Sequence, residues 1–128
     1  MIIKLPVITK KEFNEETKEV DIEKGALEVD IDTSFKAHLK WEEQGFGAAL
    51  GGIELREYTD RVQKMLTSGN PGKAELLSLL KLLYCYVNSP KLPSFKEFLG
   101  LFDYEVADEI LDKIGTVLEQ VSKSASKN

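Results

Sequence analysis

The spacing of apolar residues changes near residue 33 from every second position, as in a strand, to helical spacing. This change most constrains the fold of the chain. Residues 27–32, LEVDID, alternate apolar and acidic side chains, and TSFKAHLKWEEQ follows them directly. Alternation of this kind predicts a strand with one buried face, on which Leu27, Val29 and Ile31 lie. A β-element therefore leads straight into a helical segment.

The first 32 residues predict a small β-hairpin with a long connection. Residues 2–8, IIKLPVI, are rich in β-branched side chains, but Pro6 cannot donate to a ladder, so we expect an edge strand or a broken strand. Residues 10–24 are highly charged and are expected to form an exposed loop or hairpin tip. The segment carries nine acidic residues against five lysines, so it holds most of the negative charge of the chain.

The rest of the chain predicts about five helices, because apolar residues recur at helical spacing between clear punctuation signals. Thr33 or Ser34 would cap the first, Asn70 and Pro71 would begin the third, and Ser94 with Glu97 forms a capping box for the fourth. The glycine-rich residues 45–52, GFGAALGG, are expected to be a linker, and residues 122–128 a disordered tail. The expected helices span approximately residues 35–44, 53–66, 71–87, 94–101 and 104–121.

The expected fold is mainly α with a small N-terminal β-hairpin, which is α+β by strict count. We expect one domain over residues 1–121, with residues 1–32 as a hairpin arm and residues 33–121 as a helical body. A chain of 128 residues suits one domain that needs no disulfide or metal.

Two of the expected helices carry more apolar surface than one buried face needs. The third is apolar nearly all round, so it is either the centre of the core or the lining of a groove that a partner fills. In the first, Phe35 and Leu39 share one face and Ala37 and Trp41 share another. One face would pack on the hairpin and the other on the body or on a partner.

Charge and apolar patterning exclude several classes of function. The formal net charge is −5, which argues against nucleic acid or an anionic membrane as partner. The single cysteine, Cys85, lies in an apolar run, which indicates a small buried hydrophobe in a reducing compartment. The longest apolar stretch, Leu76–Val87, is too short to span a bilayer. A cytosolic protein is expected.

No motif for catalysis, cofactor binding or metal binding is complete. GFGAALG has Leu50 where the dinucleotide fingerprint needs its third glycine, and no strand precedes it. Gly72 and Lys73 lack the other residues of a phosphate loop. His38 is the only histidine, so the chain alone can build neither a Cys-His zinc site nor a Ser-His-Asp triad. We expect no enzyme, although carboxylates of two chains could still converge on a metal.

The order of elements resembles the small tail assembly chaperones of long-tailed bacteriophages that infect Gram-positive hosts, above all the lactococcal type that serves the tape measure protein. In that family a strand pair leads into a helix with a hydrophobic-x-x-x-hydrophobic-x-Trp-Glu pattern, which Phe35, Leu39, Trp41 and Glu42 match. The chain departs from the pattern after Gln44, where it inserts the glycine-rich segment. The likeness covers the architecture of the whole chain and about a dozen residues of motif.

The resemblance implies a non-enzymatic protein that coats and solubilises the tape measure protein in the host cytoplasm and is absent from the mature virion. It implies self-association into a ring or spiral, and a longer frameshifted form of the chain as a further partner. A helix-binding groove would be lined by Leu76, Leu79, Leu80 and Leu83, joined by Trp41. The hairpin strand with Leu27, Val29 and Ile31 would add to a neighbouring copy.

A second hypothesis is an adaptor of regulatory or antitoxin-like type that binds one folded partner at fixed stoichiometry. A direct DNA binder would need a basic recognition helix. Lys36 and Lys40 are offset by Glu42 and Glu43, so the first helix does not supply one.

Overall fold

In the part of the chain that the structure describes, the fold is a mixed α+β arrangement of five α-helices and a three-stranded antiparallel sheet of order β1-β2-β3. It was obtained as a computed structural model, which describes residues 2–68, 75–90 and 92–126. The expected N-terminal hairpin and five helices are confirmed, but the fold is not purely helical. The elements are β1 (Ile2–Asn14), β2 (Glu19–Ile31), α1 (Phe35–Glu43), the 3-10 turn η1 (Ala48–Leu50), α2 (Leu55–Ser68), α3 (Leu76–Tyr86), β3 (Val87–Asn88), α4 (Phe95–Leu99), the 3-10 turn η3 (Tyr104–Val106) and α5 (Ala107–Ser126).

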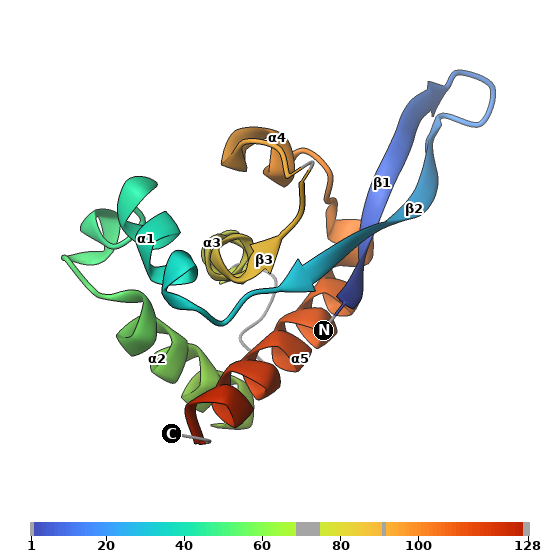
Figure 1. Ribbon diagram of the computed structural model, residues 1–128. Helices are drawn as coiled ribbons and strands as arrows, with labels where there is room; N and C mark the ends of the chain where they lie inside the picture. Colours follow the sequence, from blue (N-terminus) through green and yellow to red (C-terminus); the bar gives the residue numbers. More distant parts are fainter. Residues whose placement is uncertain (1, 69–74, 91, 127–128) are drawn as a thin grey trace.

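The hairpin is much longer than expected. Of the two alternatives for residues 10–24, the exposed hairpin tip is confirmed and the loop is wrong. β1 and β2 pair from Ile2–Asp30 to Asn14–Glu19, so only the residues between Asn14 and Glu19 form the turn. Nearly all side chains of this outer half are exposed on both faces, so the short alternation of residues 19–23, EVDIE, is not matched by a buried face. Figure 1 shows the outer half of the hairpin projecting beyond the helices.

β1 is an edge strand, as Pro6 predicts, but the strand is not broken there. Pro6 pairs with Ala26, and the register shifts only later, between Ile8 and Lys10. The backbone N–H of Ile8 donates to the carbonyl of Leu101 at 2.7 Å, away from β2. Pro6 lies two residues earlier, so its nitrogen faces that same outer side, where no ladder bond is lost.

β3 exists only through a long-range contact, and the prediction that the third helix continues to Val87 is wrong. Val87 pairs with Ile31 and Asn88 with Asp30, which adds a short third strand to the base of the hairpin. The N–H of Asp32 also donates to the carbonyl of Tyr86 at 2.8 Å. The expected start of the helix at Asn70 and Pro71 lies outside the described residues.

Residues 45–52 are not a simple linker. Phe46 is buried in the core, and residues 48–50 form η1. Gly47 packs so tightly that a Cβ there would lie 2.3 Å from the carbonyl oxygen of Ile53 and 2.7 Å from Nε1 of Trp41. The segment is therefore a packed corner between α1 and α2.

The prediction of a disordered tail is wrong for residues 122–126, which continue α5 to Ser126. The side-chain amide of Gln63, on α2, donates to the carbonyl of Leu118 at 3.2 Å and to the hydroxyl of Ser122. These bonds to α2 hold part of the last turns of α5. Residues 127–128 lie outside the described part of the chain.

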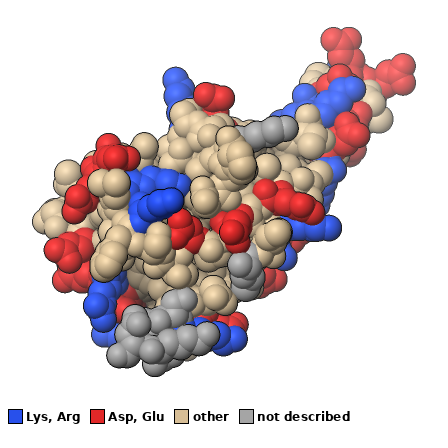
Figure 2. Space-filling model, viewed as in Figure 1, with Lys and Arg blue, Asp and Glu red and all other residues tan. Residues whose placement is uncertain are grey.

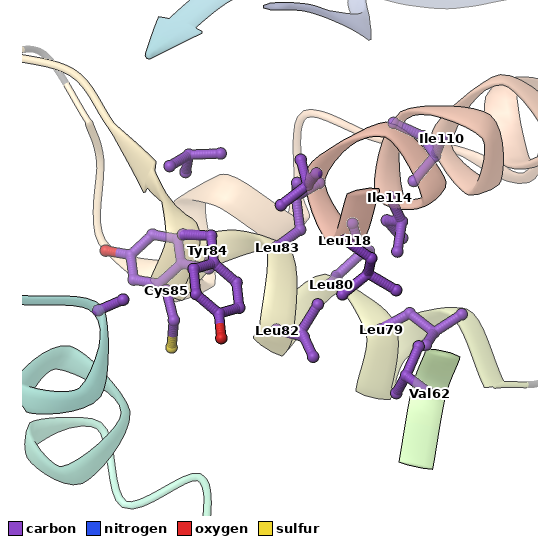
Figure 3. Close-up of a cluster of buried hydrophobic side chains, with 14 of the residues drawn as sticks. Val62, Leu79, Leu80, Leu82, Leu83, Tyr84, Cys85, Ile110, Ile114 and Leu118 are labelled. Atoms are coloured by element: carbon purple, nitrogen blue, oxygen red, sulfur yellow. The ribbon is translucent and has the colours of Figure 1, made fainter. Parts of the chain in front are cut away.

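α3 is the centre of the core, as its apolar composition indicates. Eight of its eleven residues are buried, and in Figure 1 it lies among the other helices and the base of the sheet. Figure 3 shows Ile110 and Ile114 of α5 and Val62 of α2 gathered around the leucines of α3. The same buried cluster includes residues of the hairpin such as Leu5.

Candidate functional site

The five residues predicted to line a groove are all buried, and only two of them reach a surface hollow, so their contact with a partner stays a prediction. Leu79, Leu83 and Trp41 are at most 2% exposed and pack inside the core. Leu76 and Leu80 are 7% and 5% exposed, and they alone of the five reach the edge of a surface hollow. The reason is that other elements pack against most sides of α3. Because the helix is apolar nearly all round, its sequence does not show which side stays open.

The hollow lies where α3 meets α4 and the segment that leads into η3. Its volume is about 320 Å³, which is at the lower end of the range of small-molecule pockets and can also receive one or two inserted side chains. Leu77 and Tyr104 stand at it with 55% and 66% of their surface exposed. The lining is mainly apolar and consists of Leu76, Leu77, Leu80, Leu99, Phe102, Asp103 and Tyr104.

Asp103 is the one charged residue of this lining, and it connects the hollow to the hairpin. Its Oδ2 lies 2.7 Å from Nζ of Lys11 on β1, and its Oδ1 accepts a bond from the N–H of Glu105. The hydrogen bond from Lys11 and then that from Glu105 lower the pKa of Asp103. The carboxylate therefore stays charged at neutral pH and holds the hairpin against the rim of the hollow.

Trp41 is a core residue that fixes α1 to the corner before α2. Its Nε1 donates to the carbonyl of Ile53 at 3.0 Å, which satisfies the only polar atom of the ring. The ring packs against Phe46 and Tyr58, with centroids 5.7 and 5.3 Å away. Trp41 is therefore not exposed to a partner.

The other face of α1 is exposed. Phe35 is 87% and Leu39 is 54% exposed, while Ala37 and Trp41 are buried. Among the described residues, the ring of Phe35 contacts only the ring of His38, with the two centroids 5.9 Å apart. Of the two apolar faces predicted for this helix, one thus joins the core and the other faces solvent.

Lys40 fastens α1 to the end of α3. Its Nζ donates to the carbonyls of Tyr84 at 3.1 Å and Val87 at 2.9 Å, and it lies 5.0 Å from the centroid of the Tyr84 ring. These carbonyls belong to the C-terminal end of a helix, which favours a cation. Burial lowers the pKa of Lys40.

The side chains predicted for self-association face the body. Val29 and Ile31 are buried, and Leu27 is half-buried against the same core cluster. A neighbouring copy could therefore reach the backbone edge of the strand, and not these three side chains. The edge of β2 is paired with β3 only at Asp30 and Ile31.

The buried polar groups are engaged in structural contacts. Burial raises the pKa of the Cys85 thiol to about 12, so it is protonated and unreactive at neutral pH. Thr59 donates to the carbonyl of Leu55, and its hydroxyl lies 2.9 Å from that of Tyr86. Within residues 2–68, 75–90 and 92–126, no three His, Cys, Asp or Glu residues are grouped to hold a metal ion.

No helix in the described part of the chain combines the length and apolarity needed to cross a bilayer. Comparison of the chain with known protein families, with curated proteins and with solved structures found no match.

Proposed function

We propose that this protein is a non-catalytic tail assembly chaperone that holds an amphipathic helical stretch of a long phage tape measure protein in the host cytoplasm. The proposal rests on the resemblance of the strand pair and of the α1 pattern to that family. The observation that carries it in the structure is the apolar hollow beside α3. Leu77 and Tyr104 supply exposed apolar surface there, and the lining can receive a side chain from the apolar face of a helix.

The second apolar surface, on α1, extends the area that a long partner could contact. Phe35 and Leu39 are two of the four residues on which the resemblance rests, and both are exposed. The matched Trp41 is buried, so its role is to hold α1 in place. Single exposed apolar residues are ordinary on protein surfaces, and the proposal therefore depends mainly on the hollow.

The surface charge suits a protein that keeps an apolar partner in solution. Figure 2 shows acidic side chains at the tip of the hairpin and charges of both signs over the visible face of the body. The formal net charge of −5 would limit aggregation of loaded complexes by mutual repulsion. Many copies bound along one long partner would also gain from avidity between neighbours.

The test is co-expression with the tape measure protein, followed by pull-down and a solubility assay. The informative variant is Leu77→Asp, because this side chain is exposed and a charge there need not unfold the core. Leu80→Asp would place a charge in the core, where it would destabilise the fold whatever the function. Leu39→Asp tests the second surface, and Leu50→Asp is the matched control, since Leu50 is 41% exposed on η1 and belongs to neither surface.

We expect the wild type to keep the tape measure protein soluble. Leu77→Asp should lower the affinity for the tape measure protein at least tenfold, because one buried anchor of the contact is lost. If Leu39→Asp weakens binding as much as Leu77→Asp, the partner surface extends to α1. If the wild type leaves the tape measure protein insoluble and nothing co-purifies, the chaperone proposal fails. An adaptor that captures one folded protein at fixed stoichiometry would then be the better description.

A further inference from the structure

The two strands of the hairpin carry opposite charge. β1 has three lysines against one glutamate, and β2 has five acidic residues against one lysine. Within one hairpin this sets opposite charges across the strands: Nζ of Lys4 lies 3.9 Å from Oε1 of Glu28, and Lys10 lies opposite Glu23 in the register. It also means that the two outer edges of the hairpin differ in sign.

Both outer edges are open along the projecting half of the hairpin. On the side of β1, the N–H of Ile8 bonds to Leu101, and the described residues place no further strand beyond it. On the side of β2, β3 covers only Asp30 and Ile31, which leaves residues 19–29 without a second strand in the described structure. Long open edges of this kind are templates for pairing with another chain.

An exposed apolar pair lies near the tip, between these edges. Phe13 and Val20 are cross-strand partners, and they are 59% and 47% exposed. A two-stranded hairpin standing alone in water is only marginally stable. The projecting half therefore has both the backbone groups and the apolar surface that a further strand would cover.

We infer that β1 of one copy pairs with the outer edge of β2 of a neighbouring copy, so that the hairpins form a continuous antiparallel sheet. This inference names the contact behind the self-association in the proposed function. Pairing of β1 with β1 would set lysines against lysines, and pairing of β2 with β2 would set carboxylates against carboxylates, which disfavours both symmetric arrangements. The unlike pairing joins a basic strand to an acidic one.

The register already present within the hairpin gives the contacts across the new edge. Continued into the next copy, it brings the neighbouring copy's β1 residue Lys10 beside Glu23, and its Phe13 beside Val20. The apolar pairs then form an unbroken stripe across successive hairpins. Lys11 remains on Asp103 of its own body, so the added contact draws on the backbone and on Lys10, whose Nζ also lies 3.3 Å from Oε1 of Glu12 on the same strand.

Each copy uses two different surfaces in this contact, so the assembly can continue from copy to copy. Such head-to-tail contacts give a ring when the rotation closes and a helical assembly when it does not. The right-handed twist between neighbouring strands supplies a rotation at each step.

Charge-reversal variants test this contact because they separate unlike from symmetric pairing. Lys10→Glu alone and Glu23→Lys alone should each raise the self-association Kd of the full chain on the order of tenfold, measured by sedimentation velocity. An equimolar mixture of the two single variants should associate again, because Glu23 of one variant then faces Lys10 of the other. The double variant should assemble with itself for the same reason.

Lys36→Glu and Glu57→Lys are the matched controls, since both residues are exposed and lie on helices of the body and not on the hairpin strands. Phe13→Ser should weaken association without any change of charge, whereas Phe35→Ser should not. Circular dichroism of each variant checks that the body stays folded. Association should weaken as salt is added, because the screening length falls from about 10 Å at 0.1 M to about 3 Å at 1 M.

The inference is overturned if the wild type is monomeric at every concentration, or if the mixture of single variants fails to associate. It is also overturned if Glu23→Lys associates like the wild type, which would indicate symmetric β1 pairing. The proposed function is tested separately, since Lys10→Glu leaves the hollow intact. A Lys10→Glu protein that binds the tape measure protein as single copies would support both proposals, and a wild type that self-associates without binding it would sink only the function.

Discussion

The indole nitrogen of Trp41 and the backbone oxygen of Ile53 lie 3.0 Å apart, and Gly47 packs against both atoms. The indole N–H of Trp41, near the end of α1, donates to the carbonyl of Ile53, which lies just before α2. The close approach is possible only because residue 47 has no Cβ.

Gly47→Ala should therefore lower the free energy of unfolding by about 1–3 kcal/mol, because the added methyl group must push Ile53 and Trp41 apart. Denaturant unfolding followed by Trp41 fluorescence measures this directly. Gly115→Ala is the matched control: nothing lies within 4 Å of a Cβ there, and the residue is inside α5. It should stabilise the protein by about 0.5–1 kcal/mol. Equal effects of the two variants would contradict the packed corner.

The two sides of α3 should respond very differently to truncation. Leu82 is fully buried and Leu77 is 55% exposed, although both are leucines of one helix. Leu82→Ala should destabilise the protein by about 2–5 kcal/mol, since it removes buried methyl groups and leaves a cavity. Leu77→Ala should change stability by about 0.5 kcal/mol or less. Thermal or urea unfolding of both variants would show whether this side of α3 is in fact open.

Cys85 should make the folded protein sensitive to alkali. The buried thiol keeps its proton up to about pH 12 when folded, whereas in the unfolded chain it loses the proton near the ordinary value of 9.0. The folded state then binds more protons, so stability falls as pH rises above about 9. At pH 10.5 this loss amounts to about 2 kcal/mol.

Cys85→Ala should lack the decrease in the free energy of unfolding that the thiol causes above pH 9. Buried tyrosines with raised pKa values remain in both proteins and add their own decrease. The measurement is the free energy of unfolding between pH 8 and 10.5. The informative quantity is the slope with pH, because truncation of a buried side chain shifts the whole curve. Parallel curves for the variant and the wild type would rule out the buried, protonated thiol.

Lys11 should hold the projecting hairpin to the body through Asp103. Lys11→Met keeps the bond from Glu105 to Asp103 and removes only the 2.7 Å ion pair. Overall stability should change by about 1 kcal/mol or less, as for other exposed pairs. Amide exchange of the outer hairpin should become faster, because the contact that steadies its base is lost.

Lys4→Met is the control, since Lys4 makes its 3.9 Å pair with Glu28 within the hairpin and not with the body. Hydrogen exchange should be measured at low protein concentration, so that self-association does not add protection. Because the pKa of Asp103 is lowered from 3.8, the pair should contribute fully above that pH and fade as pH falls through the lowered value. Unchanged exchange in Lys11→Met would mean that the ion pair does not steady the hairpin.

Local sequence signals predicted several elements well. Ser94 caps α4, as the capping box predicts, because its hydroxyl oxygen accepts a hydrogen bond from the N–H of Glu97. The same hydroxyl donates to the carboxylate of Glu97. α2 begins and ends within two residues of its predicted limits. These features depend on contacts between residues a few positions apart, which a sequence displays directly.

The sequence by itself determined the order of elements, the buried alternation that ends β2, the central place of α3 and the buried state of Cys85. Tertiary structure decided that the charged residues 10–24 form paired strands, that Val87 leaves its helix to pair with Ile31, and which face of α1 is buried. It also decided that Leu77 and Tyr104, and not Leu79 or Leu83, border the hollow. The physical reason is range: alternation and capping are local, whereas cross-strand charge pairing and the choice of exposed face depend on partners dozens of residues away.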